Sequence, residues 1–393
     1  MSMMLLTAQA FPPRSGGIET LMSALARYAV DAGETVHVFA DGDGAAEKFD
    51  QETKPPYNIT RFSGIKPLRR RLKGHAVGKA VQHAISQNAV QEADVNMSVS
   101  KDVYIFADSW KSLEHLPAGL SVPVIAYAHG NEFPRPRAEK AGSPTHYPKH
   151  ARIQKALSKA SHLITVSRDT RGRAEPFLPG GLEASIIHPP IEPAPVADAA
   201  DMQFAEELWP SSSVRLLALC RLIEWKGLDQ AIKALALLRD DGVDAQLVIA
   251  GEGDDQTRLE SLAAELGLLD RVKFAGRIEG GRKSALFESA DIFVQPGRRV
   301  NGQCEGFGIT YIEAALHGLP SISGNAGGAV DAVIDEVTGL VIDAVQPRNV
   351  SDALGRLIAD KKLYKRLSRG AKAHGEAALW PQQIKRILAL KER

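Results

Sequence analysis

The sequence contains only two cysteines, Cys220 and Cys304, among its 393 residues. Two thiols cannot form a disulfide framework, so we expect both to stay reduced, as is usual in the cytoplasm. No apolar run reaches the ~18 residues that a membrane span requires. The short apolar N-terminus also lacks the basic flank of a signal peptide. The sequence therefore predicts a soluble, cytoplasmic protein.

The chain has almost no net charge, because 48 Lys and Arg residues are balanced by 47 Asp and Glu residues. This balance gives no general attraction to nucleic acid, and we expect no nucleic-acid partner. It conceals one local asymmetry, because residues 53–91 contain no Asp or Glu. The same stretch carries the bases Lys54, Arg61, Lys66, Arg69, Arg70, Arg71, Lys73 and Lys79.

Short apolar segments alternate with helix-length segments along the whole chain, which predicts doubly wound α/β sheets. The length suggests two domains, at roughly 100–200 residues each. In the first half, the expected strands are 3–6, 36–39, 103–106, 124–127 and 163–166. After a strand at 186–191 and a segment rich in Pro, Ala and Asp, the pattern restarts with a strand at 214–220.

We therefore predict two Rossmann-like domains that face each other across a cleft. The expected boundaries are 1–191 for the first domain, 192–212 for a solvated linker, 213–375 for the second domain, and 376–393 for a C-terminal helix that packs back toward the first domain. Ligands of open α/β sheets bind at the carboxyl ends of the strands. Loops after the strands are thus the places to look for functional residues.

Two such loops contain groups suited to phosphate. Gly16 and Gly17 stand between the first expected strand and a helix. There, a backbone without side chains and the free N–H groups of a helix N-terminus can approach an anion. The loop is not a G-x-G-x-x-G fingerprint, so nicotinamide or flavin is not favoured. Arg221 and Lys226 follow the first strand of the second domain, where two cations can bracket a diphosphate. The alternatives are a plain turn and a solvated basic loop.

Glu305 and Glu313 form the most specific pattern, two carboxylates separated by seven residues. Gly306 and Gly308 stand where a helix should begin, which places Glu305 in a loop and Glu313 inside the helix. A helix N-terminus can bind phosphate, and a carboxylate set back from it can accept a ribose diol. Alternatively, Glu305 complements the helix dipole and Glu313 belongs to a salt bridge.

Three other positions carry weaker signals. His129 follows the expected strand 124–127 and so lies at a sheet edge, although a structural role is the alternative. Asp41 and Asp43 could form an acidic metal-binding pair, but their glycine-rich setting indicates a solvated turn. We therefore predict no metal site.

With these motifs in this order, the chain resembles the family-4 retaining glycosyltransferases of the GT-B fold. The similarity is closest to their bacterial branch, which includes the phosphatidylinositol mannosyltransferases. It covers nearly the whole chain and is strongest over 214–341, where the E-x7-E motif lies. The resemblance implies transfer of a hexose, with mannose favoured, from a GDP- or UDP-sugar. The acceptor would be lipid-linked or a saccharide, in envelope glycan or glycolipid synthesis, and the family needs no metal or cofactor.

The resemblance also implies a role for each motif residue. His129 would hydrogen-bond the donor sugar, Arg221 and Lys226 would hold the diphosphate, and Glu305 would contact the sugar hydroxyls. Glu313 would bind the ribose. The remaining donor-binding positions would act through backbone groups: Gly16, Gly17, Arg277, Ile278, Gly308, Ile309 and Thr310. The implied reaction is front-face displacement, with the leaving diphosphate as the base.

The basic stretch suggests a docking surface. Pro67 can open a helix in which Arg69, Arg70 and Lys73 share one face, opposite Leu68 and Leu72. We expect these bases, with Arg71, to dock on an anionic membrane at the inner face of the cell membrane, or on a phosphorylated, lipid-linked acceptor. A solvated basic helix is the alternative.

Two other functions fit the same fold. A nucleotide-sugar 2-epimerase would carry extra carboxylates for proton chemistry on the sugar ring. A non-catalytic nucleotide-sugar binding protein would show no turnover. The pattern of Arg221, Lys226 and the paired acids favours transfer.

Overall fold

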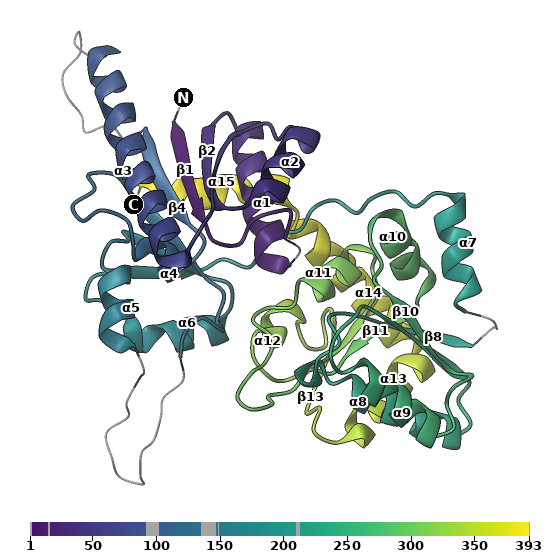
Figure 1. Ribbon diagram of the computed structural model, residues 1–393. Coiled ribbons are helices and arrows are strands. Elements are labelled where there is room, and N and C mark those ends of the chain that lie inside the picture. The colour runs from purple at the N-terminus through teal and green to yellow at the C-terminus, as the bar shows by residue number, and fades with distance from the viewer. Residues whose placement is uncertain are drawn as a thin grey trace, which may run out of the picture. The chain divides into compact units, whose positions relative to one another are not determined.

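The computed structural model describes residues 2–14, 16–91, 102–134, 147, 149–209 and 213–392. The chain divides into two compact units. Unit 1 consists of Met1–Pro190 and Trp380–Arg393, and unit 2 consists of Ile191–Leu379. Each unit is built around one parallel sheet with helices on both faces (Figure 1). The predicted pair of Rossmann-like folds is confirmed.

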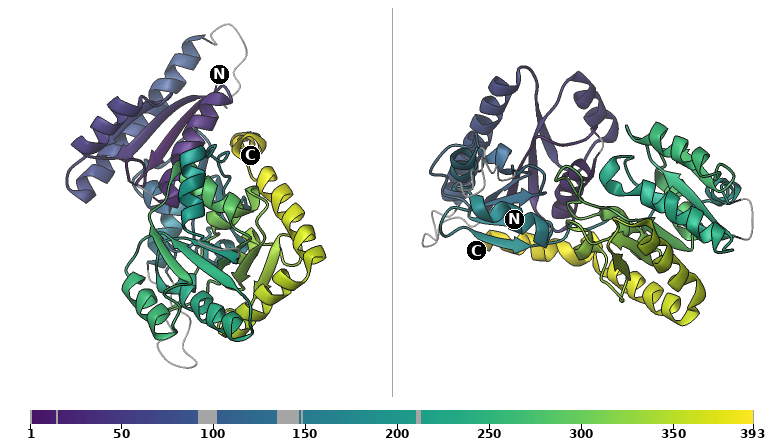
Figure 2. Two further views of the ribbon diagram at one scale, coloured as in Figure 1. Left: turned by 90° about the vertical axis from the view of Figure 1, so that its right-hand side faces the viewer. Right: turned by 90° about the horizontal axis from the view of Figure 1, so that it is seen from below.

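The sheet of unit 1 has seven strands in the order β3-β2-β1-β4-β5-β6-β7. Helices α3 (Lys66–Gln91), α4 (Trp110–Leu113) and α5 (His150–Leu157) pack on one face. Helices α1 (Gly17–Asp31) and α15 (Trp380–Leu388) lie on the other, as Figure 2 shows. The strands are β1 Met3–Ala8, β2 Thr35–Asp41, β3 Asn58–Phe62, β4 Val103–Ala107, β5 Val124–Ala128, β6 His162–Thr165 and β7 Glu183–Ile186; the remaining helices are α2 Gly44–Thr53 and α6 Arg168–Ala174.

The sheet of unit 2 has six strands in the order β10-β9-β8-β11-β12-β13. Helices α8 (Leu228–Asp240), α9 (Gln256–Glu265) and α13 (Pro347–Ala359) share one apolar core with it. Helices α10 (Gly280–Ser289) and α11 (Ile309–Leu316) contact the opposite face. The strands are β8 Val214–Leu219, β9 Ala245–Ala250, β10 Val272–Gly276, β11 Ile292–Gln295, β12 Ser321–Gly324 and β13 Gly339–Ile342; the remaining helices are α7 Ala199–Glu207, α12 Ala329–Ala332 and α14 Lys361–Ala377.

The end of the chain packs onto unit 1. The ring of Trp380, at the start of α15, stacks on Tyr28 of α1 with 5.4 Å between centroids. Beyond α15, Lys391 donates hydrogen bonds to Ser2 Oγ at 2.9 Å and to Glu34 Oε1 at 2.7 Å. Both ends of the described chain therefore meet on unit 1.

Two sequence expectations need correction. The segment 186–191 is not a strand, because β7 already ends at Ile186. The expected linker 192–212 contains α7, which packs on α10. This helix begins at a capping box, in which the Asp198 side chain accepts from the Asp201 backbone at 2.8 Å and Asp201 reciprocates. Within the described residues, we find no helix long and apolar enough to cross a membrane.

Candidate active site

Lys226 and Glu305 form the centre of the site in unit 2. Lys226 lies in the short 3-10 turn after β8, and Glu305 lies in the loop before α11. The Lys226 Nζ donates a hydrogen bond to Glu305 Oε2, and the two side chains are only 13% and 17% exposed. Burial disfavours the charged form of Lys226, but the attraction of Glu305 outweighs it and raises the pKa of Lys226. The lysine is therefore a fixed cation.

Gln295 orients Glu305 through a side-chain hydrogen bond. This fully buried residue ends β11, and its amide Nε2 donates to Glu305 Oε2 at 3.3 Å. The side-chain Oε1 of Gln295 accepts a hydrogen bond from the Thr310 hydroxyl at 3.4 Å, and the backbone carbonyl of Gln295 accepts one from the Tyr311 hydroxyl. Sequence reasoning missed Gln295. A polar residue that ends an apolar strand was the available signal.

The predicted helix N-terminus is present at Gly308, which caps α11 without any side-chain hydrogen bond. Its φ of +100° is in the left-handed region, and a Cβ there would lie 2.5 Å from the Tyr311 ring. Only glycine fits this turn without strain. Ile309 and Thr310 follow as the first helical residues, so their N–H groups have no partner within the helix.

Glu313 lies one turn further along α11 and is paired with a lysine. The Lys283 Nζ on α10 donates to Glu313 Oε1 at 2.7 Å. The Lys283 and Glu313 side chains are 27% and 24% exposed, so the pair remains open to a ligand. Sequence reasoning did not find Lys283, because only the fold brings α10 beside α11.

The remaining cationic positions of unit 2 are less enclosed. Arg221 is exposed after β8. The loop it opens is held at Gly227, where φ is +74° and a Cβ would lie 1.9 Å from the Pro296 carbonyl oxygen. Arg277 and Ile278 follow β10, and the exposed Arg277 guanidinium pairs with Glu279 at 2.8 Å. Among the described residues, neither Arg277 nor Ile278 makes a hydrogen bond or ion pair with Lys226 or Glu305.

In unit 1, polar residues follow four neighbouring strands. Asp41 ends β2, and Gln9, Asp108 and His129 come directly after β1, β4 and β5. The His129 Nε2 lies 2.9 Å from the Asp108 carbonyl oxygen, which can only accept, so Nε2 carries the proton and Nδ1 of a neutral ring is an acceptor. The ring stacks on Tyr127 at 5.9 Å.

The loop that leads to Gly16 and Gly17 is fixed at both ends. Asp108 Oδ2 accepts from the backbone N–H groups of Gln9 at 2.6 Å and Ala10 at 3.1 Å. Arg61 donates to the Pro12 carbonyl at 2.6 Å. Gly16 caps α1 without a side-chain hydrogen bond, and Gly17 is the first helical residue.

The expected exposure of α3 is wrong. Lys73 is buried and donates to the Ala8 carbonyl at 2.6 Å and to Asp41 Oδ1 at 2.8 Å, while Arg69 pairs with Asp41 at 2.9 Å. Asp41 is not in a solvated turn. It is buried at the end of β2 and requires counter-charges, which draws the bases inward. Of the four bases expected to dock, only Arg71 is exposed.

The opposite face of α3 points outward. Ile65, just before the helix, is 78% exposed, and Leu68 and Leu72 are 59% and 51% exposed. The second acid of the suspected metal pair is also occupied, because Asp43 caps α2 by accepting from the Ala46 N–H at 3.1 Å. Both aspartates thus have structural partners.

Two protein families match this chain. Residues 15–194 match the family described as Glycosyltransferase Family 4, and residues 200–374 match Glycosyl transferases group 1. The two matches cover unit 1 and unit 2 in turn. The chain is a family-4 glycosyltransferase. It is a retaining, nucleotide-sugar-dependent enzyme of the GT-B fold.

Characterised relatives cover nearly all of this glycosyltransferase. A GDP-mannose-dependent alpha-(1-6)-phosphatidylinositol monomannoside mannosyltransferase from Mycolicibacterium smegmatis is 28% identical over 91% of this chain and 90% of its own. A GDP-mannose-dependent monoacylated alpha-(1-6)-phosphatidylinositol monomannoside mannosyltransferase from Corynebacterium glutamicum is 27% identical over 95% and 93%. HepE from Anabaena, solved with UDP, has the same fold, with a TM-score of 0.72 at 19% identity over 99% and 98% of the chains.

These matches decide between the functions left open by the sequence. The epimerase and the non-catalytic binding protein are not supported, and the predicted glycosyltransferase is confirmed. The role of each site residue in this glycosyltransferase remains a prediction. Cys220 and Cys304 are both free and buried, and burial raises the pKa of Cys220 to about 12.

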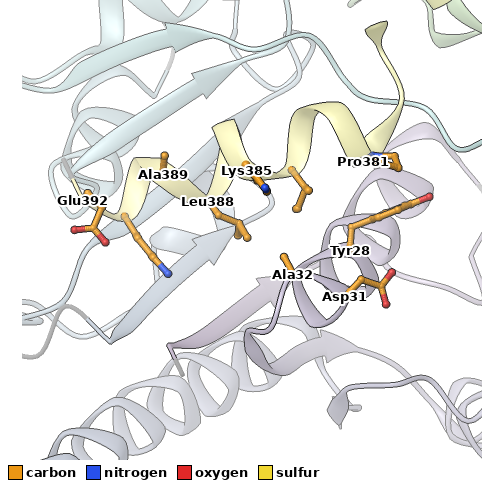
Figure 3. A pocket seen from close by; sticks show the side chains of 10 residues that line it. Tyr28, Asp31, Ala32, Pro381, Lys385, Leu388, Ala389 and Glu392 are labelled. Atoms are coloured by element: carbon orange, nitrogen blue, oxygen red, sulfur yellow. The ribbon is translucent and has the colours of Figure 1, made fainter. Parts of the chain in front are cut away.

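A groove of about 640 Å³ lies between α1 and α15 of the glycosyltransferase (Figure 3). It is lined by the last turn of α1, around Tyr28 and Ala32, and by Pro381, Leu388 and other residues of the C-terminal segment. Gly16 lies at the opposite end of α1. The groove is therefore separate from the edge of the sheet that carries Gln9, Asp108 and His129.

Proposed function

We propose that this glycosyltransferase moves a hexose, with mannose favoured, from a nucleoside-diphosphate sugar to a lipid-linked or saccharide acceptor. The observation that carries the proposal is the cluster of Lys226, Glu305 and the uncapped start of α11. The names of the relatives support GDP-mannose and a glycolipid acceptor.

The cluster matches the charge that develops during transfer. Cleavage of the glycosyl–phosphate bond builds negative charge on the departing diphosphate. Lys226, Arg221 and the N–H groups of Ile309 and Thr310 are donors for that charge. Preorganised donors of this kind supply a large part of the rate acceleration in such reactions. The leaving diphosphate then takes the proton of the acceptor hydroxyl as the new bond forms on the same face, without a metal.

Glu305 changes partner in this scheme. In the structure, the Glu305 carboxylate neutralises Lys226. A bound diphosphate competes for the same ammonium group, which frees Glu305 to accept hydrogen bonds from the hydroxyls of the donor sugar. Gln295 keeps the carboxylate in place during the exchange.

The other site residues complete donor recognition. Glu313, steered by Lys283, accepts the ribose hydroxyls. The backbone of Arg277 and Ile278 meets the base, and Gly16 and Gly17 offer amides to a phosphate. The His129 Nδ1 accepts a hydrogen bond from the donor sugar, since its Nε2 proton is held by the Asp108 carbonyl.

A glycolipid acceptor requires the enzyme to reach a membrane surface. The outward face of α3 combines the exposed Ile65, Leu68 and Leu72 with the exposed base Arg71. Apolar side chains beside a base are typical of helices that lie in the interface of an anionic membrane. We assign the docking role to this face, in place of the inward bases Arg69, Arg70 and Lys73.

The test is turnover of a panel of GDP- and UDP-sugars with candidate acceptors. We expect release of nucleoside diphosphate from one donor, with GDP-mannose favoured, and retention of the anomeric configuration in the product. If no donor in the panel is transferred or slowly hydrolysed, the proposed activity is wrong. If only a donor other than GDP-mannose is turned over, the proposed transferase activity stands but mannose is not the transferred sugar.

A further inference from the structure

Arg70 carries a charge that no carboxylate neutralises in the part of unit 1 that the structure describes. Its guanidinium donates to the neutral amide oxygen of Gln9 at 2.6 Å. The neighbouring bases Arg69 and Lys73 share the carboxylate of Asp41, and the buried Asp108 adds a second negative charge near Lys73. Arg61 pairs with Asp50 at 2.7 Å.

Glu114, an acid within electrostatic range of Arg70, is also engaged. The charge of Arg70 acts on Glu114, but Arg152 already donates hydrogen bonds to both carboxylate oxygens of Glu114. The inward face of α3 thus sets three bases (Arg69, Arg70 and Lys73) against two buried acids (Asp41 and Asp108), which leaves one positive charge in excess. Charges in such a place usually have a counter-ion or bind one.

Three nitrogen donors around Arg70 have no acceptor. These are Arg70 Nε, Arg69 Nε and Gln9 Nε2, all buried and without a hydrogen-bond partner. Buried N–H groups are rarely left in this state, because each has lost its water without gaining an acceptor. All three are donors, so a ligand that fits this place has to offer oxygen acceptors. Together with the excess positive charge, this indicates an anion.

The position of this group connects it to His129. Arg70 bonds Gln9, the Gln9 backbone N–H bonds Asp108 Oδ2, and the Asp108 carbonyl bonds His129. Gln9 follows β1 and His129 follows β5, with β4 alone between them. Two strand spacings separate these ends by about 10 Å. That distance leaves room for one sugar or polyol ring.

We propose that Arg70 and Gln9, with Arg69 beside them, bind the phosphate group of the acceptor. The inference rests on the proposed function, since it assigns a chemical class to the acceptor of that reaction. The fork of Arg70 suits two oxygens of one phosphate, and the Gln9 amide can supply a further donor. The acceptor is then a phosphomonoester or phosphodiester that carries its phosphate one ring away from the new glycosidic bond.

The experiment measures binding of phosphate compounds to the full chain with the donor site already saturated by nucleoside diphosphate. The probes are inorganic phosphate, glycerol 3-phosphate and the soluble lipid dibutyryl phosphatidylglycerol, titrated at constant ionic strength. The variants are Arg70→Met, Arg70→Lys and Gln9→Leu. Lys79→Met is the matched control, because it removes a positive charge from an exposed position of the same helix, outside the proposed site and the docking face.

We expect the wild-type chain to bind at least one probe, and Arg70→Met to weaken that binding about tenfold or more. Arg70→Lys should lie between the two, Gln9→Leu should also weaken binding, and Lys79→Met should equal wild type. A preference for the monoester indicates a soluble phosphorylated acceptor, and a preference for the diester indicates a lipid headgroup. Either preference supports the site.

The inference is overturned if the wild type binds none of the probes, if Arg70→Met and Gln9→Leu both bind as the wild type does, or if Lys79→Met loses as much as Arg70→Met. Equal affinity of all variants for nucleoside diphosphate shows that they are folded. Failure of the wild type to bind any nucleoside diphosphate would instead contradict the proposed function, whatever the phosphate probes do.

Discussion

Lys226 and Glu305 are hydrogen-bonded although 79 positions separate them in the sequence. Lys226 follows β8 and Glu305 follows β11, and these two strands are neighbours in the sheet. Parallel pairing thus brings the cation and the carboxylate to one edge. Each is the only charged partner that the other has within salt-bridge distance among the described residues. Any ligand that binds one of them must therefore disturb the other.

Removal of Lys226 should abolish most turnover. Lys226→Met takes away a preorganised donor, and we expect kcat/KM to fall by about 10²–10³-fold, as for loss of an oxyanion donor. Arg221→Ala should act in the same direction. Lys273→Met, which removes an exposed lysine from β10, is the control and should stay near wild type. A loss smaller than about tenfold, or ~1.4 kcal/mol, would exclude Lys226 from the site.

The two acids should differ in what they bind. Glu313→Gln should weaken binding of both the donor and the free nucleoside diphosphate, because the ribose is common to the two. Glu305→Gln should impair transfer but spare binding of the nucleoside diphosphate. Calorimetric titration beside steady-state kinetics separates these effects. The reverse pattern would show that the two roles are exchanged.

Lys283 should act through Glu313. We expect Lys283→Met to lower the affinity for a nucleoside diphosphate but to leave the affinity for its 2′,3′-dideoxy analogue unchanged, because the analogue offers no ribose hydroxyls to Glu313. Glu313→Gln should show the same selectivity. Equal loss for both ligands in Lys283→Met would mean that the lysine contacts the nucleotide directly.

Membrane docking should depend on the outward face of α3. In sedimentation with anionic vesicles, Leu68→Ser with Leu72→Ser should lower binding, and Arg71→Glu should lower it further and make the remainder less sensitive to salt. Leu269→Ser, which changes an exposed leucine in unit 2, is the control. Binding that is equal for neutral and anionic vesicles, or unchanged in all variants, would contradict the docking surface.

His317 should make the enzyme less stable in mild acid. Burial, with Lys372 and Lys283 nearby, lowers the pKa of His317 to about 4. In the unfolded chain, His317 takes up a proton near pH 6.5, whereas in the folded protein it stays neutral until about pH 4. The free energy of unfolding should therefore fall between about pH 6.5 and pH 4, by up to about 3 kcal/mol.

Urea unfolding at several pH values checks this. His317→Asn should lack this part of the pH dependence, although it also loses the stacking of the imidazole on Phe287 at 5.4 Å. The diagnostic quantity is therefore the slope against pH and not the stability at one pH. Identical slopes in the wild type and the variant would show that His317 titrates normally.

The strands whose residues are apolar were predictable from the sequence, since each is a short run buried on both faces. The edge strand β3 was not, because its residues Asn58–Phe62 are at most half-buried and include polar side chains. Helix α7 could have been found, since Asp198 and Asp201 have the spacing of a capping box. The Pro-rich surroundings favoured a linker instead.

The site was predictable where a motif is local and not where it depends on strand order. The loop positions of Glu305, Gly308 and Lys226 follow from short segments of sequence. The burial of Lys73 does not, because its partner Asp41 comes from another strand and looked like part of a turn. Charge alone made α3 look like a basic surface, whereas a buried carboxylate decides which face turns inward.

The return of α15 to unit 1 has a consequence during synthesis. Unit 2 is inserted into unit 1, since Ile191–Leu379 lies between its two segments. The ribosome therefore completes unit 2 before it releases the residues that finish unit 1. Until then, Tyr28 has no Trp380 to stack on, and Glu34 has no Lys391. We expect the nascent first unit to remain incomplete, with α1 accessible to chaperones, until the segment that begins at Trp380 has left the exit tunnel and packed on it.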